Sequence, residues 1–74
     1  MTDEFLEDCL TEFPRRLRRI RMQQGLTQLE LAHRLGIQQT GVSRFESGKR
    51  SPTMRSIVRL VLALDVSADQ LLGT

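Results

Sequence analysis

A short segment of the chain carries side chains that can recognise the edges of nucleic-acid bases. Gln39, Thr40, Ser43 and Arg44 supply an amide, two hydroxyls and a guanidinium, and the segment has no carboxylate before Glu46. Glutamine can pair with adenine and arginine with guanine, each through two hydrogen bonds. The segment therefore predicts a base-reading surface, although a polar helix that only faces solvent would carry similar residues.

The spacing of apolar residues predicts that this segment is a helix from Gln39 to about Glu46. Val42 and Phe45 are three residues apart and would face inward, so that the polar side chains point away from the core. Gly41 costs about 1 kcal/mol of helix stability relative to alanine. We expect its missing side chain to let the helix backbone approach a DNA groove closely.

A second predicted helix, Gln28 to Leu35, precedes this segment. Thr27 is a good N-cap, and Glu30 three residues later completes a capping box. Gly36 follows the last apolar position of the helix, where a glycine commonly takes the left-handed conformation. The predicted buried positions are Leu31, Ala32 and Leu35.

The remaining segments are also predicted to be helical, because proline, glycine and capping residues mark their ends. A first helix is expected to start near Phe13, with Pro14 in its first turn, and to end at Gly25. Thr53 would cap a helix that runs to about Asp65, and Ser67 would open a short one ending near Leu72. No segment alternates like a strand. The predicted fold class is all-α, with five helices.

Charge is distributed unevenly along the chain. Residues 1–12, the acidic arm, hold five carboxylates and no basic side chain, whereas residues 13–74 hold all eleven basic residues and four acidic ones. A basic body of this size suits a polyanionic partner. We take residues 13–74 as the binding domain. The acidic arm would be frayed or a dimer contact, and would weaken nonspecific phosphate attraction or contact a second protein.

Five arginines crowd the predicted first helix and cannot all face one duplex. We expect one or two of them to contact phosphate, and the rest to be solvated or paired with the acidic arm. They are Arg15, Arg16, Arg18, Arg19 and Arg21.

Composition argues against catalysis, metal binding and membrane insertion. Cys9 is the only cysteine and His33 the only histidine, so there is no disulfide framework, zinc set or Cys/His pair. No apolar run approaches the roughly 20 residues of a membrane span, and the chain starts acidic, unlike a signal peptide. We expect a cytoplasmic protein that is not an enzyme and needs no cofactor.

The run from Gln28 to Lys49, together with Thr27, Pro52 and the ending Ala63-Leu64 to Leu71-Leu72, resembles the lambda-repressor and Cro-like helix-turn-helix family. The resemblance covers about residues 15–72. It implies a compact five-helix domain whose third helix lies in the major groove, braced by the second across the backbone.

The resemblance also assigns roles to residues. Gln39, Thr40 and Arg44 would read bases, with Ser43 within reach. Phosphate contacts would come from Gln28, which would also steady Gln39, and from Gln38, Lys49 and Arg50. Arg21 would pair with Glu46 and orient the third helix, a pair worth about 0–1 kcal/mol if it is exposed.

Three departures from the family pattern are Leu29, Leu62 and Asp65. Leu62 is the most informative, because with Val58 and Met54 it extends the apolar surface of the fourth helix to a second side, which must then be covered. We therefore hypothesise a homodimer that packs through the fourth and fifth helices and, in one version, the acidic arm. A few tolerated surface apolar residues are the alternative.

The function expected from these features is a homodimeric transcription regulator that binds duplex DNA at a two-fold-related operator. Within the same class, a restriction-modification controller or a prophage repressor fits equally. A different class remains open, an antitoxin-type protein that holds a partner such as a toxin and regulates its own operator. The acidic arm and the apolar surface of the fourth helix keep that alternative open.

Overall fold

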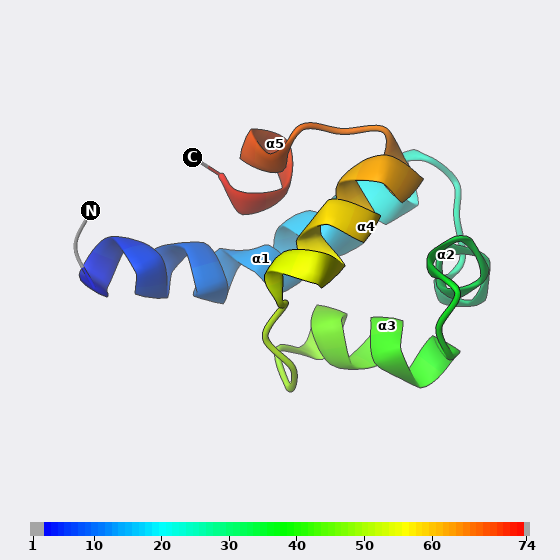
Figure 1. Cartoon of the computed structure of the whole chain (residues 1–74), viewed down its shortest axis with the longest axis horizontal. Helices are drawn as coiled ribbons and strands as arrows, with labels where there is room; N and C mark the ends of the chain where they lie inside the picture. Colours follow the sequence, from blue (N-terminus) through cyan, green and yellow to red (C-terminus); the bar gives the residue numbers. More distant parts are fainter. Residues whose placement is uncertain (1–2, 74) are drawn as a thin grey trace.

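Five helices make up the computed structural model, which describes residues 3–73 (Figure 1). Within that range no residue is in a strand, which confirms the predicted all-α fold. The bounds of the last four helices agree with the sequence prediction to within one residue. The helices are α1 (Asp3–Gln23), α2 (Gln28–Leu35), α3 (Gln39–Ser47), α4 (Met54–Leu64) and α5 (Ala68–Leu72).

α1 begins well before the predicted position. The expected start near Phe13 is wrong, because the helix runs without a break from Asp3 through Pro14. Pro14 has no N–H to offer the carbonyl of Leu10, which makes an interior proline costly in a helix. Asp3 and Glu4 in the first turn complement the helix dipole and favour the earlier start. The described part of the acidic arm, residues 3–12, is therefore helix; residues 1–2 lie outside the described range.

The core forms where all five helices and the α1–α2 loop contribute apolar side chains. Phe13 of α1 and Phe45 of α3 meet edge to face, with ring centroids 6.1 Å apart and planes at 89°. Aromatic pairs in this geometry add to the stabilisation from burial. The predicted inward positions on α2 and α3 are buried. The buried residues are Phe13, Leu17, Leu26, Leu31, Ala32, Leu35, Val42, Phe45, Leu60, Leu64 and Leu71.

The predicted caps are present at the starts of α2 and α5. Thr27 accepts a hydrogen bond from the backbone N–H of Glu30, whose carboxylate accepts one from the N–H of Thr27. Ser67 and Gln70 form the same reciprocal pair before α5. These caps satisfy N–H groups that have no partner inside their helices. They fix where α2 begins, and therefore where α3 lies beside it.

The N-terminal half of α1 projects away from the other helices (Figure 1). A helix of 21 residues is about 31 Å long, which is close to the 35 Å long axis of the described chain. The second half of α1 packs against α3 and α5. None of the helices in residues 3–73 has the length and apolar character to cross a membrane.

Candidate nucleic-acid interface

α3 presents the polar face that the sequence predicts. Its side toward the core holds Val42 and Phe45, both buried. The predicted base-reading residues Gln39, Thr40, Ser43 and Arg44 are all exposed, as is Ser47 at the end of the helix. The structure thus places amide, hydroxyl and guanidinium groups together on one accessible helix face.

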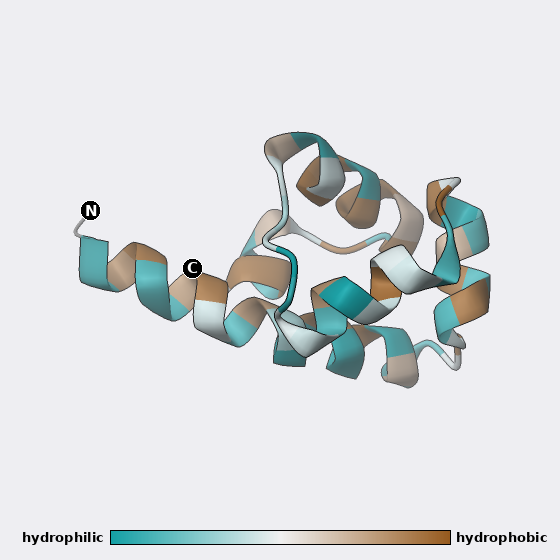
Figure 2. Cartoon of the chain, turned by 90° about the horizontal axis from the view of Figure 1, so that it is seen from below, coloured by the Kyte–Doolittle hydropathy of each residue, from teal (hydrophilic) through white to brown (hydrophobic). Residues whose placement is uncertain are grey.

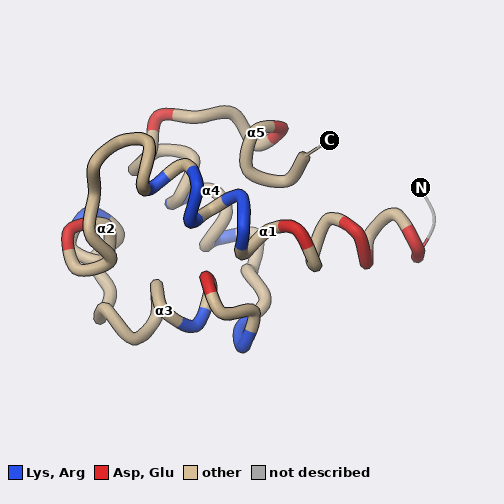
Figure 3. The backbone as a smooth tube through the Cα atoms, turned by 180° about the vertical axis from the view of Figure 1, so that it is seen from behind, with Lys and Arg blue, Asp and Glu red and all other residues tan. Residues whose placement is uncertain are grey.

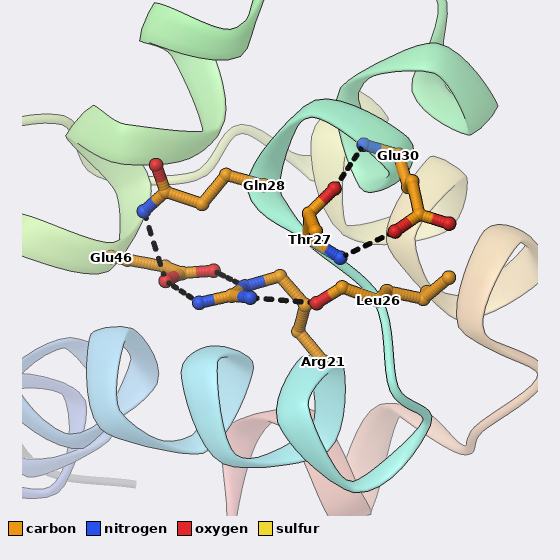
Figure 4. Close-up of polar contacts among 6 residues, drawn as sticks. All are labelled: Arg21, Leu26, Thr27, Gln28, Glu30 and Glu46. Carbon is orange, nitrogen blue, oxygen red and sulfur yellow. Dashed lines mark hydrogen bonds and ion pairs between the residues drawn. The ribbon is translucent and has the colours of Figure 1, made fainter.

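The carboxylate of α3 belongs to Glu46, and it points inward to Arg21 of α1 (Figure 4). Arg21 Nε lies 2.6 Å from Glu46 Oε2, and Nη2 lies 3.0 Å from Oε1. The expected pair is therefore formed. The small contribution to stability that is typical of an exposed pair does not apply here, however, because the side chains of Arg21 and Glu46 are only 12% and 4% exposed. The hydrogen bonds that Arg21 donates to Glu46 raise the pKa of Arg21, so this guanidinium stays charged.

Two further hydrogen bonds extend the ion pair into the loop between α1 and α2 and into α2 itself. Arg21 Nη1 donates to the carbonyl of Leu26 at 2.7 Å. Gln28 Nε2, at the start of α2, donates to Glu46 Oε1 at 3.3 Å (Figure 4). The expectation that Gln28 steadies Gln39 is not what the structure has, since this amide contacts the ion pair instead. Glu46 of α3 is thus bonded both to α1, through Arg21, and to α2, through Gln28.

The basic loop after α3 folds back onto that helix. The backbone N–H groups of Lys49 and Arg50 both donate to the carbonyl of Arg44, at 3.0 and 3.2 Å. The guanidinium carbon of Arg50 lies 5.2 Å from the centre of the Phe45 ring, within cation–π range. Both basic side chains are exposed. The loop therefore holds two cations beside the C-terminal end of α3.

The start of α3 differs from the starts of α2, α4 and α5. Gln38 is its N-cap and makes no side-chain capping hydrogen bond, whereas Thr27, Thr53 and Ser67 each cap their helices. Unpaired N–H groups at a helix start favour an anion such as phosphate. Gln38 is exposed and can donate from its own amide.

Gly41 does not have the role expected from the sequence. A Cβ at Gly41 would lie 3.0 Å from Ile37 Cδ1, so the bare side of this glycine faces the turn between α2 and α3. The glycine makes room for Ile37 to pack, and the idea of a close backbone approach to DNA is wrong.

Arg18 lies beside the predicted site, although sequence reasoning did not distinguish it from Arg15, Arg16 and Arg19. It lines a hollow together with Gln28, Ser43 and Ser47, on the same side as the base-reading face. Its position three residues before Arg21 is the signal that could have found it. Arg15 instead lies 3.7 Å from Glu12 on the same helix. Arg16 packs beside Gly73, whose missing Cβ would touch its guanidinium.

The predicted dimer residues lie apart from this face, on α4. Met54, Val58 and Leu62 are 76%, 50% and 75% exposed. They recur every fourth residue and so form one apolar stripe along the helix.

Known proteins share both sequence and fold with this chain. A family model described as helix-turn-helix matches residues 17–71. The transcriptional repressor RstR of the cryptic phage CTXphi, from Vibrio cholerae, is 40% identical over 47 residues, which cover 64% of this chain and 42% of that protein. Antitoxin HipB of Escherichia coli is 32% identical over 57 residues, covering 77% of this chain and 65% of HipB.

A solved structure gives the same result for the fold. The crystal structure of the restriction-modification controller protein C.AhdI from Aeromonas hydrophila superposes with a TM-score of 0.79 and 35% sequence identity, covering 84% of this chain and 94% of that one. The chain spans less than two thirds of the length of RstR and of HipB. With α2, the turn and α3 in place and the family model matched across them, the chain belongs to the lambda-repressor-like helix-turn-helix family of DNA-binding transcription regulators.

Proposed function

We propose that this chain is a sequence-specific regulator that inserts α3 into the major groove of duplex DNA. The observation that carries the proposal is the exposed face of α3, where Gln39, Thr40, Ser43 and Arg44 stand together and Glu46 is withdrawn into the ion pair. Removing that carboxylate from the surface leaves donors and acceptors for bases with no negative charge to repel phosphates. Gln39, Thr40 and Arg44 read base edges, and Ser43 lies within reach of them.

Groups around α3 contact the DNA backbone in this proposal. Gln38, Lys49 and Arg50 lie at the two ends of α3 and are all exposed. Gln28 and Arg18 border the same face from α2 and α1. Phosphate contacts at both ends of a recognition helix fix its register without reading sequence.

The regulator acts as a homodimer on a two-fold-related operator, in the cytoplasm where the chromosome is accessible. Half-sites are then about one helical turn, 34–36 Å, apart. Support for a dimer comes from the exposed stripe of Met54, Val58 and Leu62, since large apolar side chains are costly to leave in water.

Selection of bound sites from random duplexes, at a stated salt concentration, tests the proposal. We expect an enriched palindromic motif, and Gln39→Ala should change the enriched base at one position of each half-site. A motif that the Gln39→Ala, Thr40→Ala and Arg44→Ala variants all select unchanged would mean that α3 is not the reading helix.

A second function is favoured by the likeness to antitoxin HipB. The chain would then hold a partner protein, such as a toxin, through its exposed apolar residues while its helix-turn-helix binds DNA. Selection from random duplexes separates the proposed regulator from a pure interaction protein, which enriches no motif at any salt concentration, whereas an antitoxin-type protein that also binds DNA enriches one.

A further inference from the structure

The apolar stripe that buries α1 in the core continues past the point where the core ends. Leu6, Leu10, Phe13 and Leu17 are spaced by four, three and four residues, which places them on one side of a helix. Phe13 and Leu17 are 1% and 0% exposed, whereas Leu6 and Leu10 are each 46% exposed. Hydrophobic positions recur along the projecting part of α1 in Figure 2. Residues 3–12 of the acidic arm are therefore an amphipathic helix whose apolar side is only partly covered.

α4 carries a second exposed apolar stripe, formed by Met54, Val58 and Leu62. Leu6 and Leu10 are four residues apart, as are Val58 and Leu62, so the two pairs have the same spacing along their helices. They do not cover each other within one chain, because both remain exposed in the structure.

The two stripes are bordered by opposite charges. The arm helix has only acidic charged residues, and two exposed ones, Asp3 and Glu7, lie beside its apolar stripe. α4 has only basic ones, Arg55 and Arg59, and both are exposed. In the backbone tube of Figure 3, the positions of acidic residues (red) follow the projecting half of α1, and those of basic residues (blue) start only in its second half.

We propose that the arm helix of one copy docks along α4 of a second copy, and that the contact is made twice around a two-fold axis. Leu6 and Leu10 would cover Val58 and Leu62, while Asp3 and Glu7 would face Arg55 and Arg59. A two-fold dimer requires a surface that is complementary to itself, and an acidic stripe and a basic stripe on the same chain provide one. This inference rests on the homodimer proposed above and specifies how the two copies join.

Charge disfavours two other arrangements, in which α4 pairs with α4 or the arm pairs with the arm. Pairing α4 with α4 would bring Arg55 and Arg59 of both copies together, and pairing arm with arm would bring carboxylates together. Like charges brought face to face disfavour association. Docking arm on α4 is the arrangement that covers both stripes and pairs opposite charges.

Two full-length charge-reversal variants test the inference by sedimentation without DNA. One is Arg55→Glu/Arg59→Glu, in which arm and α4 are both acidic. The other is Asp3→Lys/Glu7→Lys, in which both are basic along the contact. Each alone should dimerise about tenfold more weakly than the wild type, because its two exposed pairs become repulsive. An equal mixture should recover wild-type dimerisation, since a mixed dimer pairs acidic with basic at both contacts.

A variant and a matched control test the apolar part of the contact. Leu62→Ser should weaken dimerisation, whereas Leu29→Ser, which removes an exposed leucine from α2, should not. All four variants change exposed residues, so circular dichroism should report an unchanged helix content.

The outcomes separate this inference from the proposed dimer. If both charge variants alone dimerise like the wild type, the copies join elsewhere and this inference fails while the homodimer stands. A mixture no tighter than its components also overturns the inference. Wild-type protein that stays monomeric at high micromolar concentration overturns the homodimer and this contact together.

Discussion

Arg21 and Glu46 form a two-point ion pair, with contacts of 2.6 and 3.0 Å, that joins the end of α1 to the end of α3. The pair is nearly inaccessible to water, and its remaining hydrogen bonds go to Leu26 and Gln28. It therefore anchors α3 from its inner side and leaves the exposed side chains of that helix free. It is a positioning device, and removing either partner would leave a desolvated charge.

Glu46→Gln should destabilise the protein strongly. The amide keeps the size of the side chain but leaves the Arg21 guanidinium without its counter-charge, a loss of about 3–5 kcal/mol in the free energy of unfolding for a buried pair. Urea unfolding followed by circular dichroism measures it. Glu12→Gln is the matched control, because the Arg15–Glu12 pair is exposed and worth less than about 1 kcal/mol. Equal losses in both variants would show that burial of the Arg21–Glu46 pair is unimportant.

Much of the fold is predictable because its signals are local. Thr27, Gly36, Thr53 and Ser67 each mark a helix end through hydrogen bonds or a backbone angle that involve only near neighbours. Apolar spacing then fixes which side of each helix is buried. These signals place α2 to α5 almost without error.

The start of α1 and the details of the site depend on contacts that no local signal contains. Pro14 suits the first turn of a helix and is merely disfavoured in its interior, so its presence could not locate the true start. The partner of Gln28 depends on how α2 and α3 are packed, as does the direction in which Gly41 faces. The residue types of the reading face were predictable, whereas the burial of the Arg21–Glu46 pair behind it was not.

Gln39→Ala or Arg44→Ala should cost about 1–3 kcal/mol of binding free energy on the selected operator, because each removes a two-point contact to one base. The variant should also lose preference at that one base pair, as measured by titrating operators with single substitutions. Ser47→Ala is a control on the same helix, since the Ser47 hydroxyl donates to the carbonyl of Arg44. A uniform loss over all operators would instead assign Gln39 or Arg44 to the backbone.

Lys49→Ala should weaken binding to every sequence by a similar factor. Its ammonium lies in the loop beside the end of α3, where it can neutralise one phosphate. Loss of one such contact lowers the slope of log affinity against log salt by about one. Titrations of operator and random duplex at several salt concentrations check this. A changed ratio between operator and random duplex would mean that Lys49 reads sequence.

Asp65→Gly should stabilise the protein by about 1 kcal/mol. Asp65 ends α4 with φ of +53°, the one positive φ of a residue other than glycine in residues 3–73. A side chain in this conformation is strained, and its carboxylate also lies at the negative end of the helix dipole. Asp65→Asn separates the causes, since it removes the charge and keeps the Cβ. If the Asp65→Gly variant is no more stable to thermal unfolding than the wild type, the left-handed conformation of Asp65 does not destabilise the protein.

Glu30→Gln should flatten the acid limb of the stability profile without shortening α2. The N–H of Thr27, helped by its hydroxyl, lowers the pKa of Glu30 in the folded protein. A lowered folded pKa gives stability that is present above the ordinary glutamate pKa of about 4.3 and lost as the pH falls through the folded value. Glutamine can complete the same capping box but does not titrate there. The difference in unfolding free energy between wild type and variant should therefore shrink from about pH 6 to about pH 3. If the difference stays constant over this range, the charged and the protonated forms of Glu30 stabilise the start of α2 equally.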